Sequence, residues 1–420
     1  MSAAPIYILT FGSLGDVLPL ATLGGELARR GHAVTLWCGR LHLPMVERLG
    51  VRALPLDTDA LPPMRVQASP VFKTPQMWRR VEQGLQAGYA AVAAALAALP
   101  VGSPQPIVVA STFALAGRLA QEKLGLKLAT VHLSPMCMVS FLDMPPVGDL
   151  VMPTWMPRAL RPGLGRGMER LLFDPVTARG LNALRAELGL APVRHVLSRW
   201  MHSPDLVLGL FPAWFGDPQP DWPTATQVLD FPLADAAEDA VLAEADPGLE
   251  AFLQAGAPPV VFYPGSAKRD TAAFFEEALR SCAALGRRAV LLTRYREHIA
   301  GGAELPAWAL HRAYVPLSGL LPRSAALVHC GGVGTLAQAV AAGCPQLLLP
   351  YTFDHFDNAR RLQRLNVARV HRGGGWGAAL AQLLGDASVR VACQARAAGV
   401  PEGASVRARA ASAIQALAAR

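Results

Sequence analysis

The sequence has few charges and no long apolar run, and each absence excludes a class of protein. Only 17% of the 420 residues are charged and 52% are hydrophobic, so the chain is suited to large buried cores rather than to disorder. No apolar run reaches the roughly 18 residues that a bilayer-spanning helix needs. The opening MSAAPIYILTFGSLGD has no basic segment before its first apolar run, so we expect no signal peptide.

Cysteine is also scarce, and its spacing excludes two kinds of site. The six cysteines are scattered and none forms a CxxC pair: Cys38, Cys137, Cys282, Cys330, Cys344 and Cys393. This pattern predicts the reduced thiols of the cytosol rather than a disulfide framework or a zinc centre. No cluster of metal ligands appears in the sequence either, so we expect neither a bound metal nor a cofactor.

Acidic residues are outnumbered, which gives a net charge of +8 and a pI near 9.5. A nucleic-acid-binding protein would gather such charge in a basic stripe with interleaved aromatic residues, and the sequence has no such stripe. We therefore expect no nucleic-acid partner. An anionic diphosphate substrate and an anionic membrane surface are the two alternatives that account for the charge.

The most informative stretch that is present spans residues 327–359. It begins with a short apolar strand that ends at His329, followed by a glycine turn and a segment of helical composition at 335–342. A helix that starts directly after a glycine turn presents unpaired N–H groups and the positive end of its dipole, which suit a phosphate or diphosphate. The residues of this predicted anion site are Gly331, Gly332, Gly334 and Thr335.

The motif at this turn is not that of a P-loop, because no lysine follows it, and it lacks the GxGxxG spacing. It reads HxGGxGT, and a proline-bounded strand then leads to DHFDNA at residues 354–359. The two motifs at this separation resemble the nucleotide-sugar signature of GT-B glycosyltransferases, the family of UDP-glycosyltransferases and of antibiotic and sterol glycosyltransferases. A purely structural turn between strand and helix is the alternative.

The beginning of the chain has a second glycine loop, within a βαβ pattern. Residues 5–10 and 33–38 predict strands, and residues 17–30 between them have apolar positions at helical spacing. This unit opens a doubly wound parallel sheet, which binds ligands at the carboxyl ends of its strands. Asp16 lies on the loop at that edge, and from the residues alone it is either a catalytic carboxylate or the N-cap of the helix.

The loop sequence GSLGDVLP resembles the acceptor loop of bacterial antibiotic and sterol glycosyltransferases. Many relatives carry a histidine base on this loop, and since this chain has none, the resemblance makes Asp16 the candidate base and Ser13 an acceptor contact. It also implies the GT-B fold, an α/β architecture of two Rossmann-like doubly wound domains facing across a cleft. We expect an acceptor domain at 1–234, a donor domain at 235–403, and a C-terminal helix at 404–420 that packs back on the first domain.

The same resemblance assigns the donor-binding residues. His329 and Ser266 would hold the diphosphate together with the glycine turn. Tyr314 would stack on the base, or else belong to the core, and the Val315 backbone would read the base edge. Two residues occupy positions that touch the sugar in relatives, the second of which is usually Gln there: Asp354 and His355.

Residues 136–179 mix methionine and aromatic side chains with prolines, and arginines follow them. Such side chains make adaptable apolar surfaces, so this stretch predicts either ordinary core plus loop or an apolar acceptor pocket with a basic rim. The prolines of residues 136–155 favour a loop over a long helix there. The candidate acceptor contacts are Met136, Phe141, Met144 and Trp155, with His132 as either a further contact or a hydrogen-bonded structural histidine.

Further similarity narrows the expected activity. The stretch WMHSPDLVLGLFPAWFGDPQPDWP at residues 200–223 resembles the rhamnosyltransferases that make mono-rhamnolipid. The resemblance implies an inverting, metal-independent transfer of L-rhamnose from dTDP-L-rhamnose to a 3-(3-hydroxyalkanoyloxy)alkanoic acid. The alternatives are a glycosyltransferase with another nucleotide sugar and another apolar acceptor, such as a sterol, polyketide or other lipid, and a non-catalytic GT-B partner protein. We expect a cytoplasmic location, with peripheral association to the inner membrane as an alternative.

Overall fold

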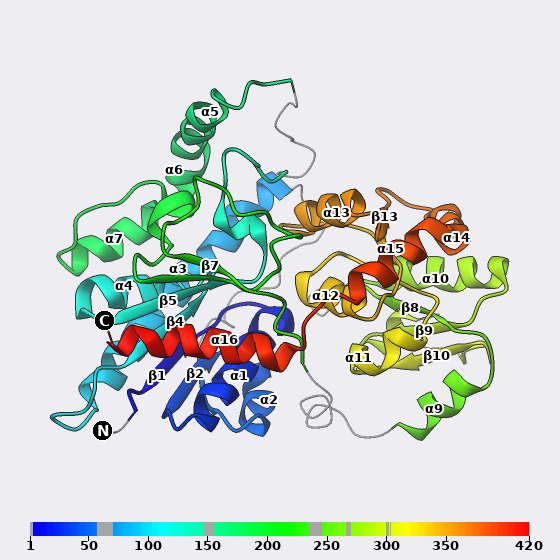
Figure 1. Ribbon diagram of the computed structural model, residues 1–420, viewed down its shortest axis with the longest axis horizontal. Coiled ribbons are helices and arrows are strands. Elements are labelled where there is room, and N and C mark those ends of the chain that lie inside the picture. Colours follow the sequence, from blue (N-terminus) through cyan, green and yellow to red (C-terminus); the bar gives the residue numbers. More distant parts are fainter. Residues whose placement is uncertain are drawn as a thin grey trace. The chain divides into compact units, whose positions relative to one another are not determined.

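The structure, a computed structural model, describes residues 3–56, 70–146, 155–234, 246–265, 270–299, 302 and 304–419, with side chains at all of these except 70–76 and 419. The chain forms two compact units (Figure 1). Unit 1 comprises Met1–Pro232 and Gly403–Arg420, and unit 2 comprises Leu233–Glu402.

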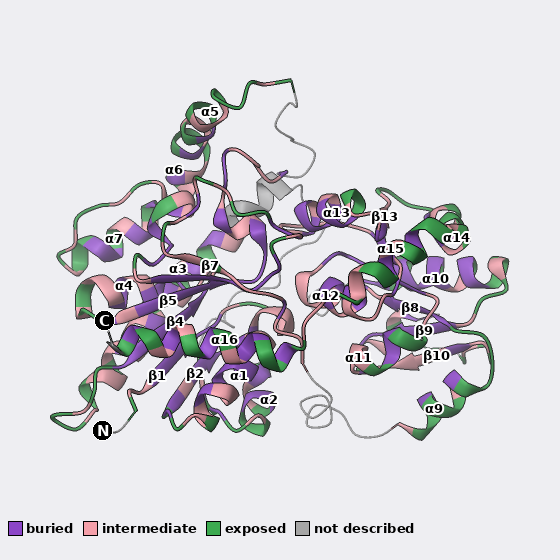
Figure 2. Ribbon diagram, in the orientation of Figure 1, coloured by how far each residue is buried: buried purple, intermediate pink, exposed green. Residues whose placement is uncertain are grey.

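Unit 1 is built on a seven-stranded parallel sheet in the order β3-β2-β1-β4-β5-β6-β7. Its central strands are short apolar runs that are buried along their length (Figure 2), as is typical of parallel sheets. The strand order reverses between β1 and β4, the switch point at which such sheets bind ligands. The strands are β1 Ile6–Leu9, β2 Val34–Cys38, β3 Arg52–Pro55, β4 Ile107–Ser111, β5 Lys127–His132, β6 Leu206–Gly209 and β7 Thr226–Val228.

Helical segments connect most of these strands, because parallel neighbours require a crossover, whereas turns alone link β6 to β7. The α-helices are α1 Leu14–Arg29, α2 Leu43–Arg48, α3 Pro70–Ala97, α4 Ala116–Leu124, α5 Arg161–Met168, α6 Asp174–Thr177 and α7 Arg179–Glu187. Shorter turns of 3₁₀ or π geometry are η1 Arg40–His42, η2 Pro135–Met138, η3 Glu169–Phe173 and η4 Val196–Trp200.

The helical segment from α5 to α6 lies beyond residues 136–155, for which the sequence predicted a proline-shaped loop. Pro162 stands in the first turn of α5 and Pro175 in the first turn of α6. The first turn of a helix needs no N–H donor from these positions, so proline starts these helices instead of preventing them.

The C-terminal helix α16 (Gly403–Gln415), followed by the turn η8 (Ala416–Ala419), belongs to unit 1 and packs on α1. Arg30 donates to Ser412 Oγ and to the Ala408 carbonyl, both at 2.9 Å. Gln415 Nε2 lies 2.9 Å from His32 Nε2. The last helix therefore completes the first unit.

Unit 2 is built on a six-stranded parallel sheet in the order β10-β9-β8-β11-β12-β13, which reverses between β8 and β11. Its strands are β8 Val260–Tyr263, β9 Ala289–Leu292, β10 Ala309–Arg312, β11 Ala326–His329, β12 Gln346–Leu348 and β13 Ala368–Val370. Its helices are α9 Pro247–Gln254, α10 Ala272–Leu285, α11 Leu317–Leu320, α12 Val333–Ala341, α13 His355–Arg364, α14 Gly377–Gly385 and α15 Ala387–Ala397, with turns η5 Arg296–His298 and η7 Leu321–Arg323. Two doubly wound α/β units confirm the predicted fold class.

Candidate active site

Asp16 lies in the first turn of α1, just beyond the carboxyl end of β1. The backbone N–H and the hydroxyl of Ser13 both donate to Asp16 Oδ2, at 2.7 and 2.9 Å. This is a capping box, which ties the carboxylate to the start of the helix. The alternative that Asp16 is the N-cap is wrong, because Ser13 is the N-cap and Asp16 is the third helical residue. Ser13, predicted as an acceptor contact, uses its hydroxyl proton to hold Asp16.

Gly12 allows the Asp16 carboxylate to lie directly against the loop backbone. Its φ is +133°, a conformation that favours glycine, and an added Cβ would stand 2.3 Å from Asp16 Oδ2. Any larger residue at position 12 would displace the carboxylate. The glycine loop therefore positions Asp16.

The protonation of Asp16 is shifted by its surroundings. Burial raises the pKa of this carboxyl above its usual range, while the hydrogen bonds from Ser13 act in the opposite direction. Both hydrogen bonds from Ser13 go to Asp16 Oδ2. Among the described residues no donor to Oδ1 is found, so this oxygen can take a substrate proton. A half-buried carboxylate of raised pKa with one available oxygen has the properties of a general base.

The end of β4 lies beside this loop, since β1 and β4 are paired and the Phe11 N–H donates to Ser111 Oγ at 3.3 Å. The next residue, Thr112, is half-buried, and its hydroxyl lies 3.0 Å from His132 Nδ1. His132 Nε2 lies 2.9 Å from His202 Nδ1, and His202 Nε2 donates to the Leu197 carbonyl at 3.1 Å. A hydrogen-bonded chain thus runs inward from the loop edge.

The predicted contact between His132 and an acceptor is wrong in this structure, because His132 has no exposed surface. The alternative of a hydrogen-bonded structural histidine is correct. Because a carbonyl only accepts, both rings donate from Nε2 and accept at Nδ1, and Thr112 donates its hydroxyl proton to His132. Burial lowers the pKa of both rings, that of His202 to about 4, so the pair is neutral.

Phe141, another predicted acceptor contact, is also buried. Asp221 accepts the Ser140 hydroxyl and the Phe141 N–H, both at 2.7 Å, and this anchors the turn after η2. The Phe141 ring packs against Gly165 of α5, where an added Cβ would approach it to 2.2 Å. Its role as a pocket-lining residue is therefore wrong, because the ring fills the space beneath α5.

The remaining predicted acceptor residues are accessible to different degrees. Met136, in η2, and Met144 are half-buried. Trp155 is 79% exposed. Residues 147–154 of the same segment lie outside the described residues. Thus Met136, Met144 and Trp155 keep surface that a ligand can reach, whereas Phe141 does not.

In unit 2 His329 ends β11 and has no exposed surface. Its Nε2 donates to Gln346 Oε1 at 3.0 Å, and its Nδ1 accepts the Gly331 N–H at 3.2 Å. Burial lowers the pKa of His329 to about 4, although the bond to Gln346 acts in the opposite direction. The prediction of a direct, charge-assisted contact to phosphate is wrong for this geometry, because both ring nitrogens are engaged within the protein.

The glycine turn that His329 holds leads into α12. Gly331 has a φ of +96°, which favours glycine, and Gly332 is the N-cap. Gly334 and Thr335 follow within the first helical turn, and residues 332–335 are half-buried rather than enclosed. The first N–H groups of a helix have no intrahelical acceptor, so this turn has the donors and the dipole that a diphosphate requires.

The second motif is tied to the turn by Asn358, which sequence reasoning did not select as a site residue. Asn358 Nδ2 donates to the Gly331 carbonyl at 2.9 Å and to Asp354 Oδ2 at 2.8 Å. Asp354 is the N-cap of α13 and is half-buried. His355 is only 8% exposed, its ring 5.0 Å from that of Tyr351, so Asp354 keeps accessible surface whereas His355 keeps little.

Three further predicted donor contacts lie in the same unit. Tyr314 follows β10 and is 42% exposed, as stacking on a base requires, while the Val315 side chain is buried in the core. Ser266 lies outside the described residues. Gly265, just before it, has a φ of +95°, and an added Cβ would stand 3.1 Å from Cys330 Sγ. The turn after β8 therefore lies against the turn after β11.

The described residues contain no group of three or more His, Cys, Asp or Glu placed to hold a metal ion. All six cysteines are free thiols. Among the described helices none is long and apolar enough to cross a bilayer.

Comparison with known proteins assigns the family. Residues 278–401 match the C-terminal domain model described as erythromycin biosynthesis protein CIII-like. The chain is 31% identical over 392 residues to O-mycaminosyltylonolide 6-deoxyallosyltransferase of Streptomyces fradiae, covering 86% of this chain and 84% of that protein. The chain belongs to the UDP-glycosyltransferase family of GT-B enzymes. This glycosyltransferase is also 29% identical over 386 residues to glycosyltransferase GtfE of Amycolatopsis orientalis, covering 88% and 86% of the two chains.

Solved structures agree on the fold of this glycosyltransferase. The glycosyltransferase of kitacinnamycin superposes with a TM-score of 0.71 at 19% identity, covering 99% of this chain and 100% of that one. VinC in complex with dTDP superposes with a TM-score of 0.67 at 18% identity, with the same coverage. The GT-B fold is confirmed, and the protein is a nucleotide-sugar glycosyltransferase.

Proposed function

We propose that this glycosyltransferase moves L-rhamnose from dTDP-L-rhamnose to the hydroxyl of a 3-(3-hydroxyalkanoyloxy)alkanoic acid, with inversion and without a metal. The observation that carries glycosyl transfer is the capping box, which holds Asp16 with one oxygen available at the switch point of unit 1. The choice of sugar is supported by the motif resemblance and by the Streptomyces fradiae relative, which transfers a 6-deoxyallosyl unit. Rhamnose is likewise a 6-deoxyhexose.

In the proposed reaction Asp16 Oδ1 takes the proton of the acceptor hydroxyl as its oxygen bonds to the anomeric carbon. The bond from that carbon to the diphosphate breaks on the opposite face, and dTDP leaves as the anion. Backbone N–H groups at the start of α12 and the helix dipole stabilise the leaving charge. His329 acts through Gly331, whose N–H it accepts, and no metal step is required.

The other donor contacts complete the proposal. Tyr314 stacks on the thymine, and the Val315 backbone contacts the edge of the same base. Asp354 accepts a sugar hydroxyl, and Ser266 contacts the diphosphate.

We assign the acyl chains of the acceptor to Met136 and Met144, whose flexible side chains adapt to apolar groups. We also propose peripheral association with the inner membrane, where such an acceptor would partition.

A panel of dTDP- and UDP-sugars, each offered with a hydroxyalkanoyloxy acid, a sterol and a polyketide aglycone, tests this function. Formation of mono-rhamnolipid with dTDP-L-rhamnose, and with no other donor of the panel, supports it. Preferential transfer to another apolar acceptor would establish the alternative. That alternative is favoured by the same relative, whose acceptor is O-mycaminosyltylonolide. Hydrolysis of any nucleotide sugar without acceptor separates both enzymes from a non-catalytic partner protein.

A further inference from the structure

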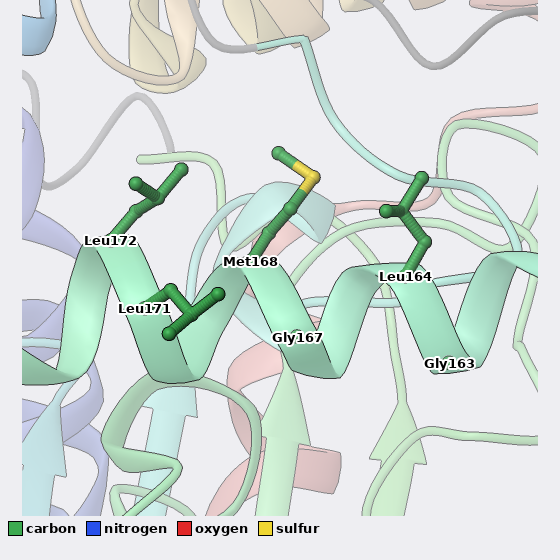
Figure 3. Close-up of a pocket in the computed structure, with 6 residues that line it drawn as sticks. All are labelled: Gly163, Leu164, Gly167, Met168, Leu171 and Leu172. Atoms are coloured by element: carbon green, nitrogen blue, oxygen red, sulfur yellow. The ribbon is translucent and has the colours of Figure 1, made fainter.

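Helix α5 and the turn η3 that continues it carry an exposed apolar stripe. Leu160, Leu164, Leu171 and Leu172 are 62%, 43%, 74% and 59% exposed. Figure 3 shows Leu164, Met168 and Leu172 extending from the same side of the helix. Single exposed leucines are ordinary, but a contiguous stripe is typical of a binding surface. We call this stripe, Leu160, Leu164, Met168, Leu171 and Leu172, the α5 surface.

The inner side of the same helix is fixed to unit 1, so the exposure of the stripe does not come from a loosely attached segment. Gly165 packs on the Phe141 ring. Glu169 is buried and accepts the Ser198 N–H at 2.9 Å and the Ser198 hydroxyl at 2.5 Å. The packed side thus determines which residues face outward.

Two glycines open the α5 surface. An added Cβ at Gly163 or Gly167 would meet no atom within 4 Å, so no neighbour requires glycine there, although glycine is less favourable than alanine in a helix. Beside them lies an open apolar hollow of about 520 Å³. Its lining is Gly163, Leu164, Gly167, Met168, Leu171 and Leu172.

Within residues 155–174, which carry the stripe, the exposed charge has one sign. The acidic residues of the segment, Glu169 and Asp174, are buried at 3% and 8% exposure. Arg158, Arg166 and Arg170 are exposed. An apolar stripe whose own segment, residues 155–174, exposes arginines but no carboxylate is complementary to an anionic lipid surface.

We propose that the α5 surface docks unit 1 on an anionic bilayer, with its leucines at the acyl boundary and the neighbouring arginines at lipid phosphates. The proposed contact is peripheral, made by exposed side chains of one helical segment. The proposal deepens the lipid-acceptor reading of the proposed function, yet its test requires neither donor nor acceptor.

Co-sedimentation with vesicles tests the docking. The wild-type chain should bind vesicles of mixed phosphatidylcholine and phosphatidylglycerol, and bind phosphatidylcholine vesicles only weakly. Leu171→Glu/Leu172→Glu should abolish binding, and Arg166→Gln/Arg170→Gln should weaken it by about 25-fold, roughly fivefold per arginine. Leu41→Glu and Arg48→Gln change equally exposed residues of unit 1 away from α5 and should bind as the wild type does.

Equal binding by the wild type and both double variants would overturn the proposal, as would equal binding to neutral and anionic vesicles. Loss of vesicle binding in the arginine variant alone would also overturn it, since the apolar stripe would then be dispensable. If the leucine variant binds vesicles normally but has a raised acceptor KM, the stripe belongs to the acceptor instead. Transfer to a short, water-soluble acceptor without vesicles reports separately on the proposed function.

Discussion

At the scale of single residues, Asp16 combines a structural and a chemical role. Asp16→Asn keeps an amide oxygen that can accept from Ser13, so the capping box and the free energy of unfolding should change little. The variant has no carboxylate to take a proton, and transfer should fall by about 10²–10⁴. Steady-state kinetics measures the loss of transfer, and urea denaturation measures the free energy of unfolding. Wild-type turnover in Asp16→Asn would remove this residue from the mechanism.

The pH dependence of the same carboxyl gives a second prediction. Since burial raises the pKa of Asp16, its base form is lost as pH falls through that raised value, and kcat/KM should fall with it. Stability should change in the opposite direction. A folded-state pKa above the unfolded value makes a contribution that is complete below the unfolded pKa and is lost as pH rises through the folded one. Denaturation of the wild type and of Asp16→Asn should be measured at pH values below and above the raised pKa of Asp16. The free energy of unfolding should fall with rising pH through this group in the wild type, and the fall should be missing in Asp16→Asn.

His329 illustrates where motif reasoning identified an important residue but not its action. With a pKa lowered to about 4, the ring should stay neutral from pH 5 to 8, with its proton on Nε2. Histidine ¹⁵N spectra of the protein with and without dTDP should show that tautomer and no titration in this range. A ring that becomes protonated near pH 6.5 and shifts on adding dTDP would restore the direct phosphate contact.

At the scale of elements, the strands and glycine turns could be predicted from the sequence, because buried apolar runs and helix-breaking glycines act locally. The burial of His132 and Phe141 could not, since it depends on His202 and on Gly165, which are distant in sequence. The link from Asn358 to the Gly331 carbonyl is long-range in the same way. No helix was predicted at 161–177, where the two prolines lie in first turns that tolerate them.

Helix α5 allows a matched test of its two kinds of glycine. Gly163→Ala meets open space and should stabilise the helix by about 0.5–1 kcal/mol. Gly165→Ala places a Cβ 2.2 Å from the Phe141 ring and should destabilise unit 1 by roughly 1–3 kcal/mol through overpacking. Urea denaturation of both variants gives the comparison. Equal effects of the two substitutions would mean that α5 does not pack on Phe141.

At the scale of the whole molecule, unit 1 is completed by residues from both ends of the sequence. Ile414 and Val406 of α16 have no exposed surface, and Arg30 of the first βαβ unit bonds to Ser412 and Ala408. A fold assembled from such distant segments depends on non-local contacts, which no window of sequence reveals. Only the family resemblance suggested a returning helix, whereas the contacts that hold it come from the structure.

These contacts predict where damage to the last helix is felt. Ile414→Ala removes a fully buried side chain and should lower the free energy of unfolding by about 2–5 kcal/mol. Because α16 packs on α1, hydrogen exchange should accelerate first in α1 and β1, whereas dTDP affinity should persist, since the turn after β11 belongs to unit 2. Ser412→Ala, an exposed change on the same helix, should cost at most about 1 kcal/mol. If exchange in α1 and β1 is unchanged by Ile414→Ala, α16 does not stabilise unit 1.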